Sequence, residues 1–441
     1  MLRIHNALIR SKLDYAATVY GSARKSVLRY LDTIHHQGLR IATGAFRTSP
    51  ISSLYALYNE PSLSSRRNKL SLNFYFHIKC HPSHPLYSHV LTPSCSTHFS
   101  NRPALIPTFG LRMKKLLTDL YLEDFNVLEI AELIPSWNNI KVKIFDIFEG
   151  LTKDETSPVI YQQIFYAFLQ HFNDFRTIYT DGSKFDNHAA SAVVCDSEVI
   201  SEKLHSAFSV FSSECNAILL ALQFISRQLY KKWLIFSDSK SCIDALKNLD
   251  NKPHSIIHHI INTYLSLSNN SFEIIFVWIP GHVGIPGNEK ADSIAKSTHN
   301  LSNKSLSLYD VQNLIADSLT QQRQVDWDGE LNNKLHEIKP LLKPFTPCYQ
   351  NRKSQVLINR LRIGHTRLTH KHLILNETAP TCNFCLEPLT MKLFLTQCLK
   401  FKLKRSQYFN CYFPTLLYLL GDPPHPNLML YLKDIGFYNL I

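Results

Sequence analysis

The sequence predicts a mixed α/β domain between two mainly helical flanks. From about residue 175 to residue 298, short apolar runs of β type alternate with helical spacing, which is typical of a sheet covered by helices. On either side, apolar residues recur at helical spacing instead. Because 441 residues exceed a single ordinary core, we divide the chain into four segments. These are a helical segment at 1–90, a connector at 91–170, the α/β domain at 171–300 and a helical segment at 301–441.

The amino-terminal flank is expected to be helical. In residues 1–80, apolar residues follow helical spacing between breaks near Gly44 and Pro50. Residues 81–137 are rich in His, Pro and Ser, and this composition indicates a connector. After residue 300, helical patterns return in two stretches, 311–319 and 356–361.

The central segment predicts five strands with helices between and after them. The expected order is strands at 177–182, 189–195 and 199–208, a helix at 213–229, a strand at 233–238, helices at 239–249 and 253–267, a strand at 272–278 and a helix at 286–296. Three consecutive strands followed by alternating helices and strands give a mixed sheet, part antiparallel and part parallel.

Positive charge is concentrated at the amino-terminal end. The formal net charge is +12, and residues 1–120 hold 16 Lys and Arg against 4 Asp and Glu. A second basic cluster, Arg352–Arg405, has eleven basic residues against two acidic ones. Such surfaces favour a polyanion, most directly a nucleic acid, although basic excess is also a common solubility device. We therefore expect nucleic acid to bind through the basic flanks.

Composition argues against two classes of protein. The chain has no apolar run of the length that crosses a bilayer, and its opening residues, MLRIHNALIRSKLDY, carry charges where a secretory segment is continuously apolar. Ten cysteines in 441 residues are too sparse for a disulfide scaffold. We expect an intracellular protein with no membrane partner, and the sequence leaves nucleus and cytoplasm open.

Two acidic residues follow apolar strand runs. Asp181 in IYTDGSK precedes a predicted glycine turn, and Asp238 ends the run WLIFSD. If the two strands are parallel neighbours, both carboxylates lie at the carboxyl edge, where open α/β sheets bind ligands. An Asp before Gly is more commonly a solvated turn residue, so Asp181 alone does not decide between the two interpretations.

Two further acids lie on predicted helices. Glu214 is expected in a first turn capped by Ser212 or Ser213, and its neighbours at helical spacing are apolar, so it belongs to a buried face. Asp292 follows Ala291 on another predicted helix and is likewise a carboxylate expected on a buried face. Buried carboxylates need partners.

Four converging carboxylates repel one another unless cations lie between them. Ligand sets made only of oxygen suit hard cations such as Mg²⁺ or Mn²⁺. A pair of such ions can hold the attacking water and the leaving oxygen of a phosphodiester, so the implied chemistry is phosphodiester hydrolysis.

The stretch GHVGIPGNEKADSIA adds a histidine to the acids. Gly281, Gly284 and Gly287 are expected to form a mobile loop that approaches its neighbours closely. His282 at its tip is placed to transfer a proton or assist product release, and the alternative is a surface histidine that caps a turn. Its place beside Asp292 favours the catalytic interpretation.

Residues 175–298 resemble a type 1 ribonuclease H domain. Four motifs match in order: YTDGSK with Asp181, SSECNAILLAL with Glu214, IFSDSKSCIDAL with Asp238, and GHVGIPGNEKADSIA with His282 and Asp292. The resemblance implies a ribonuclease H-like, five-stranded mixed sheet with flanking helices. It also implies two Mg²⁺ ions held by the four carboxylates, assistance from His282, and cleavage of the RNA strand of an RNA:DNA hybrid.

The same resemblance assigns hybrid contacts. Ser183 and Asn216, and more weakly Ser239 and Lys240, match positions that touch the hybrid backbone, whereas the alternative is turn and helix solvation. Glu289 is interpreted as structural within its loop. The basic, tryptophan-rich helix of some family members is missing, and residues 171–300 hold 11 basic against 13 acidic residues. Holding the substrate would then depend on the basic flanks.

The flanks carry a second resemblance. The stretches ALIRSKLDYAATVYGSA, GLRIATGAFRTSP and EPSLSSRRNKL resemble the region after the palm in reverse transcriptases of non-LTR retrotransposons, and PSW at 135–137 precedes YTDGSK as it does there. A polymerase needs paired aspartates, but the nearest approach to Tyr-x-Asp-Asp is Tyr121–Asp124. We expect a truncated retroelement polyprotein without polymerase activity. The alternative is a catalytically inactive, nucleic-acid-binding remnant.

The carboxyl-terminal stretches LRIGHTRLTHKHLI and CNFCLEPLTMKLFLTQC resemble the Cys/His region of the same elements. Cys382, Cys385 and Cys398 are candidate Zn²⁺ ligands, but Leu393 stands where the pattern expects histidine. Tetrahedral structural sites need four ligands, and the candidates for the fourth are His365, His370 and His372. The alternative is a decayed site with free thiols.

Overall fold

The structure is a computed structural model of the 441-residue chain. It describes all residues except 95–97, 100–101, 103–104, 123–124, 131–140, 197, 249–253, 300 and 347–350. Several features singled out in the sequence lie outside the described residues: the PSW stretch at 135–137, the acidic pair at 123–124, and the expected helix ends at 249 and 253.

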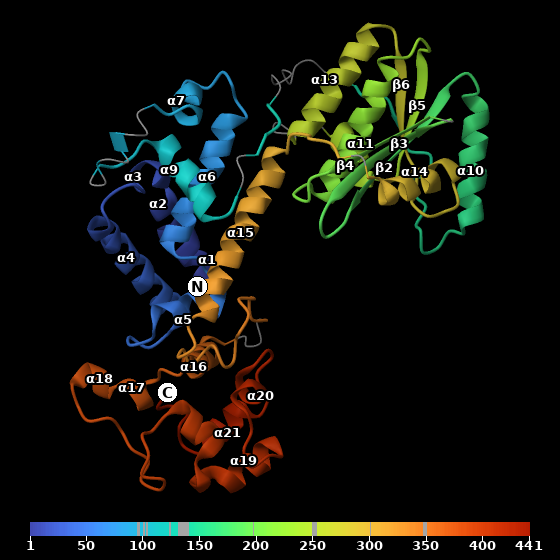
Figure 1. Ribbon diagram of the computed structural model, residues 1–441. Coiled ribbons are helices and arrows are strands. Elements are labelled where there is room, and N and C mark those ends of the chain that lie inside the picture. The colour runs from blue at the N-terminus through green and yellow to red at the C-terminus, as the bar shows by residue number, and fades with distance from the viewer. Residues whose placement is uncertain are drawn as a thin grey trace. The chain divides into compact units, whose positions relative to one another are not determined.

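The chain divides into two compact units (Figure 1). The first unit combines Met1–Leu72 with Asp317–Ile441, and the second is Asn73–Ala316. The sequence placed 1–90 and 301–441 in different segments, whereas the structure packs most of both into one unit. Helices α6 (Leu63–Lys79) and α15 (Leu308–Asp328) each contribute to both units.

The described part of the first unit is helical, as expected of the flanks. Besides its shares of α6 and α15 it contains α1 (Leu2–His5), π-helix η1 (Asn6–Arg10), α2 (Ser11–Asp14), α3 (Ala17–Tyr20), α4 (Lys25–Thr43), α5 (Ile51–Tyr58), α16 (Arg352–Ile363), α17 (Arg367–His370), α18 (His372–Leu375), π-helix η2 (Leu393–Gln397), 3-10 helix η3 (Leu399–Phe401), α19 (Lys402–Phe409), α20 (Leu416–Leu420) and α21 (Leu428–Asp434).

One hydrophobic core joins the two ends of the chain in this unit. Leu39 and Leu54 belong to the same buried cluster as Leu357 and Phe394. The Asn359 side-chain amide donates hydrogen bonds to the carbonyl oxygen of Thr43 (2.8 Å) and the hydroxyl of Tyr58 (3.0 Å). Local spacing carries no signal for pairing between residues some 300 positions apart, so the sequence could not predict this grouping.

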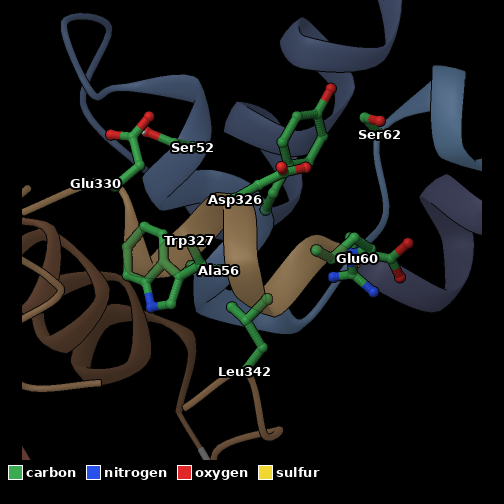
Figure 2. Close-up of a pocket in the computed structure, with 10 residues that line it drawn as sticks. Ser52, Ala56, Glu60, Ser62, Asp326, Trp327, Glu330 and Leu342 are labelled. Atoms are coloured by element: carbon green, nitrogen blue, oxygen red, sulfur yellow. Dashed lines mark hydrogen bonds between the residues drawn. The ribbon is translucent and has the colours of Figure 1, made fainter. Parts of the chain in front are cut away.

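The first unit also has a pocket of about 140 Å³ (Figure 2). It is lined by Ser52, Tyr55, Ala56, Glu60, Ser62, Arg323, Asp326, Trp327, Glu330 and Leu342. Protein neighbours already engage its charged groups: Arg10 bonds Glu60, Gln322 bonds Asp326, and Ser52 bonds Glu330. We therefore assign this pocket no ligand.

The second unit is built around a mixed sheet. Its strands are β1 (Ile144–Phe145), β2 (Arg176–Lys184), β3 (Ala189–Cys195), β4 (Glu198–Leu204), β5 (Lys232–Ser237) and β6 (Glu273–Trp278), in the spatial order β1-β6-β5-β2-β3-β4. Its helices are α7 (Tyr87–Leu91), α9 (Phe109–Asp119), α10 (Pro158–His171), α11 (Val210–Ile225), α12 (Lys240–Lys247), α13 (Ser255–Asn269) and α14 (Pro286–Ser297).

The sheet has the mixed character that the sequence predicts. Strand β2 pairs antiparallel with β3, which pairs antiparallel with β4, whereas β2–β5, β5–β6 and β1–β6 are parallel. The five expected strands correspond to β2–β6. The prediction of five strands was short by one, because β1 adds two residues beside β6 within a stretch that we interpreted as connector. A two-residue strand is too brief for any periodic signal.

Both faces of the sheet are covered, which explains why the central strand β5 is apolar at four successive residues, from Trp233 to Phe236. In β5, Trp233 and Ile235 belong to the core formed with α11 and α13, whereas Leu234 and Phe236 belong to a second core with α10. Successive side chains of a strand point to opposite faces, so a strand between two helical layers must be apolar throughout. In the part of the chain that the structure describes, no helix is both long and apolar enough for a membrane span.

Candidate active site

Asp181 lies where the parallel pairing of β2 stops. The last parallel pair is Thr180 with Ser237, and Asp181 is already past the end of β5. The sequence-based expectation that the strand ends at Asp181 is wrong, because β2 continues to Lys184 and pairs Asp181 with Ala192 of β3. The carboxylate therefore lies at the carboxyl edge of the parallel part of the sheet, on a strand held rigidly by its antiparallel neighbour.

Gly182 brings Glu214 to Asp181. The expected glycine turn is absent from this described segment, since Gly182 pairs with Ser191 inside β2. A Cβ atom at Gly182 would lie 2.3 Å from the Glu214 backbone nitrogen and 2.5 Å from the Ser213 carbonyl carbon. Glycine is therefore required here by the close approach of α11 to the strand.

Glu214 is held on the buried face of α11, as predicted. Glu214 is 7% exposed, and its neighbours Cys215, Ala217 and Ile218 are fully buried. The expected cap, Ser212 or Ser213, was wrong by three or four residues, because the N-cap is Ser209, whose hydroxyl oxygen accepts a hydrogen bond from the Ser212 backbone (3.1 Å). Glu214 thus lies in the second turn of the helix.

Asp238 follows β5 directly and is fixed from two sides. The side-chain amide of Asn288 donates to Asp238 Oδ2 (3.2 Å), and the indole N–H of Trp278 donates to the Asp238 carbonyl oxygen (3.1 Å). Sequence reasoning gave neither residue a role at the site. A Cβ atom at Gly281 would lie 2.8 Å from Asp238 Oδ2, so the loop after β6 passes closely over this carboxylate.

Asp181, Glu214 and Asp238 converge. One carboxylate oxygen from each lies within 4.8 Å of the others. Burial, reinforced by the charge of Asp238, raises the pKa of Asp181 to about 6. Burial also raises the pKa of Glu214 and that of Asp238, with Asp181 acting in addition on Glu214. The protein alone therefore does not compensate the three charges.

The three carboxylates fit a hard divalent cation. Glu214 Oε2 is buried and has no hydrogen-bond partner in the described part of the chain, although a buried carboxylate oxygen without one is costly. A ligand set made of oxygens at this spacing suits Mg²⁺ or Mn²⁺.

Asp292 lies outside the group of three. Its Oδ2 accepts a hydrogen bond from Lys296 Nζ at 2.7 Å, one helical turn further along α14. Asp292 is still close enough for its charge to raise the pKa of Asp181 and of Asp238. The structure thus brings three of the four predicted carboxylates into contact range and pairs the fourth with an ammonium.

His282 is presented on the loop between β6 and α14. Its side chain is 64% exposed, its φ is 58°, and its Nδ1 lies 3.8 Å from Glu289 Oε2. Glu289 Oε1 accepts a hydrogen bond from the Gly284 backbone (3.2 Å), which agrees with the structural role expected of Glu289. The imidazole is near enough for its charge to lower the pKa of Asp238, although burial raises that pKa more.

The four residues expected to touch nucleic acid differ in their surroundings. Ser183 donates to Asp181 Oδ2 (3.1 Å). Asn216 is 3% exposed and its amide donates to the Ser191 hydroxyl (3.2 Å), so its described contacts are inside the domain. The Ser239 hydroxyl lies 3.2 Å from that of Ser241, and Lys240 lies exposed with its Nζ 5.2 Å from the centre of the Trp278 ring.

The two strands, two helices and loop of this site fall within one segment that a family model recognises. Residues 173–300 match the family model of RNase H. The RNase H domain covers 128 of the 441 residues and includes all four predicted carboxylates and His282. It supports a hydrolase of the ribonuclease H type that acts on nucleic acid, with a sheet of the predicted class. Members of this family typically use divalent metals, which fits the acidic cluster.

A second cluster of metal-binding type lies in the carboxyl-terminal part of the first unit. Cys398 Sγ is 3.8 Å from Cys382 Sγ and 3.4 Å from Cys385 Sγ. Among the described residues, the ligand atoms that lie within 4.8 Å of one another here come from these three cysteines and from none of the three candidate histidines. His365 Nδ1 lies 3.1 Å from the Thr48 hydroxyl, and His370 Nε2 lies 3.3 Å from Lys334 Nζ.

Proposed function

We propose that the chain hydrolyses the RNA strand of RNA:DNA hybrids with two divalent cations held in its RNase H domain. The observation that carries the proposal is the convergence of Asp181, Glu214 and Asp238 from a strand, a helix and a second strand end within the segment matched by the family model. Three elements deliver carboxylates to one point, and among the described residues the buried Glu214 Oε2 has no hydrogen-bond partner there, which is costly unless cations bind.

Each residue has a role in this mechanism. Asp181, Glu214 and Asp238 would hold the ions, Asp292 would complete the second site, and Asn288 orients the Asp238 carboxylate through its hydrogen bond. When bound, the divalent cations activate a water molecule and stabilise the leaving oxygen. His282, exposed on its loop beside Asp238, supplies a proton to the leaving group or aids its release.

The test is cleavage of an RNA:DNA hybrid by the purified full chain. With Mg²⁺ we expect internal cuts in the RNA strand and none in the DNA strand, and a chelator should abolish them. Asp238→Asn is the matched variant, because the amide keeps an oxygen that can accept the Asn288 hydrogen bond while the charge is removed. Equal signals from the chain and this variant would leave the inactive, nucleic-acid-binding remnant as the better description.

We also propose a wider context and a tether. The resemblance of the flanks to non-LTR retrotransposon reverse transcriptases supports an origin in a retroelement polyprotein without polymerase activity. Basic residues of the flanks would hold the hybrid, because residues 171–300 carry slightly more acidic than basic residues.

The tether predicts a smaller salt dependence when exposed basic residues are neutralised. Deleting the amino-terminal segment would remove Leu39 and Leu54 from the core, so we choose point changes. Arg24, Lys25 and Arg29 are exposed at the start of α4. The logarithm of the binding constant falls linearly with the logarithm of the salt concentration, by about 0.9 per phosphate contact. Changing all three residues to Gln should make this slope less steep by roughly 2 to 3. Fluorescence anisotropy with a labelled hybrid measures this, with Lys247→Gln as control, and an unchanged slope contradicts the tether.

A zinc site at Cys382, Cys385 and Cys398 is the second candidate. The sulfur separations favour it, because thiolates at about 2.3 Å from a tetrahedral Zn²⁺ lie about 3.8 Å apart. Backbone N–H groups of Cys385 and Phe384 lower the pKa of Cys382, whereas burial raises the pKa of Cys398 to about 11. The fourth ligand would come from outside the described group.

Zinc content tests this site. The purified chain should retain about one Zn²⁺ against a chromophoric chelator. Cys385→Ser should weaken Zn²⁺ affinity by at least about 100-fold, because losing a ligand costs more than losing a residue that hydrogen-bonds to a ligand. Cys411, a free cysteine outside the cluster, provides the control variant Cys411→Ser. If Cys385→Ser and Cys411→Ser retain zinc equally, the cysteines are free thiols.

A further inference from the structure

Lys296 is a charged residue of the acidic site to which the proposed mechanism gives no role. It lies in the last turn of α14, and its ammonium is 2.7 Å from Asp292 Oδ2. The Asp292 side chain is only 18% exposed, whereas that of Lys296 is 53% exposed. The pair therefore differs from an ordinary surface pair at this spacing, because the carboxylate is mostly enclosed and only the lysine reaches solvent.

The ammonium engages one of the two carboxylate oxygens through which Asp292 could bind a divalent cation. The other three carboxylates have oxygens within 4.8 Å of one another, but Asp292 does not belong to that group. The field of Lys296 also reaches Asp181. It lowers the pKa of Asp181, against the larger effects of burial and of the charge of Asp238, which raise it. One lysine thus acts on carboxylates of both β2 and α14.

We propose that Lys296 is a positioning residue that occupies the Asp292 carboxylate in the metal-free protein and competes with the second divalent cation for it. This inference rests on the proposed function, since it assumes that Asp292 serves the second ion. Binding of the first ion to Asp181, Glu214 and Asp238 leaves the Lys296–Asp292 pair intact. Binding of the second ion requires the ammonium to leave, and the exposed side chain of Lys296 has solvent to move into.

Such competition makes the second binding step weaker than the chain's carboxylates alone would allow. An ammonium a few ångströms from a divalent ion repels it, and it also blocks a ligand oxygen. Removing the charge while keeping the length of the side chain should strengthen the second step by about tenfold, the order expected from one charge at this range in a solvated site. The first step should change by no more than about twofold.

Mn²⁺ binding to the full chain, followed by electron paramagnetic resonance and calorimetry, tests the proposal. Lys296→Met should tighten the weaker Mn²⁺ step about tenfold, while Lys296→Arg stays close to the unaltered protein. Lys290→Met is the matched control, because Lys290 is an exposed lysine of the same helix. In an Asp292→Asn background, where the ammonium has no carboxylate at this position to occupy, Lys296→Met should change Mn²⁺ binding by no more than about twofold. The Mg²⁺ concentration at half-maximal cleavage should fall in parallel.

The outcomes separate this inference from the proposed function. If Lys296→Met changes Mn²⁺ binding no more than Lys290→Met does, or acts equally in the Asp292→Asn background, the competition is overturned whether or not hybrids are cleaved. If the second step tightens as expected but no hybrid is cut, the competition stands and the proposed function fails. A chain that binds no Mn²⁺ overturns both.

Discussion

Replacing Gly182 with alanine is expected to lower hybrid cleavage by at least about 100-fold and the free energy of unfolding by about 3 kcal/mol. The added Cβ would lie 2.3 Å from the Glu214 backbone nitrogen and 2.5 Å from the Ser213 carbonyl carbon. Both are backbone atoms of α11, so no side-chain rotation relieves the contact. The helix must move away from β2, and Glu214 moves with it.

The measurement compares initial cleavage rates and denaturant unfolding for Gly182→Ala and for Gly329→Ala. Gly329 is a fair control, because a Cβ there would meet its nearest atom at 3.5 Å, which is ordinary van der Waals contact. We expect Gly329→Ala to leave the cleavage rate unchanged. Full activity in Gly182→Ala would mean that the approach of α11 to β2 does not position Glu214.

Gly182 also illustrates what the sequence could and could not predict. The order of strands and helices from β2 to α14 follows from periodicity and was predicted almost entirely. The role of Gly182 was not predicted. Asp-Gly is a common turn signal, but glycine is also the residue required where a strand and a helix pack closely, so the residue type alone does not distinguish the two. Only the register of β2 against β3 distinguishes the two.

The prediction of the α11 N-cap was wrong for a related reason. Three serines, Ser209, Ser212 and Ser213, all suit an N-cap, and the local sequence does not rank them. Ser209 is the cap because its hydroxyl accepts from the Ser212 backbone, while the Ser213 hydroxyl donates back to the Ser209 carbonyl oxygen (3.0 Å). The burial of Glu214 was nevertheless predictable, since the apolar face of a helix does not depend on where the helix begins.

Side-chain partners within the site were the least predictable part. Asn288 and Lys296 were visible only as neighbours of Asp292 at helical spacing, and their hydrogen bonds to Asp238 and Asp292 depend on how α14 lies against the sheet. The carboxylates themselves carry a stronger signal, because a charged residue at an apolar strand end or on an apolar helix face conflicts with burial. Sequence therefore identifies the ligands before it identifies what orients them.

Asp238→Asn is expected to reduce hybrid cleavage by at least about 1,000-fold and at the same time to stabilise the metal-free chain. The amide keeps an oxygen that can accept the Asn288 hydrogen bond, so the fold around position 238 is preserved. It removes one of three clustered charges, whose mutual repulsion contributes to the raised pKa of Asp181 and of Glu214. Unit charges about 4 Å apart repel by about 1 kcal/mol even in water, so the free energy of unfolding should rise by about 1 to 2 kcal/mol.

The direction of the pH dependence follows from the same charges. The pKa of Asp181 is about 6 in the folded chain against an ordinary value of 3.8, so the folded state takes up protons more readily than the unfolded state. Without metal, stability is therefore lost as pH rises from about 4 to about 6, and Asp238→Asn should reduce this loss. Mg²⁺ should raise the melting temperature of the unaltered chain above pH 6 and have little effect on the variant.

Thermal unfolding with and without Mg²⁺, together with hybrid cleavage, distinguishes a catalytic cluster from a merely acidic one. In a catalytic cluster the repulsion among the carboxylates destabilises the metal-free chain. The variant must therefore be more stable than the unaltered chain in the absence of metal and inactive in its presence. If Asp238→Asn lowers the melting temperature of the metal-free chain, the three carboxylates do not repel as their spacing requires. Unchanged cleavage by the variant would remove Asp238 from the mechanism, and would contradict the proposal that β2, the end of β5 and helix α11 are assembled to bind cations.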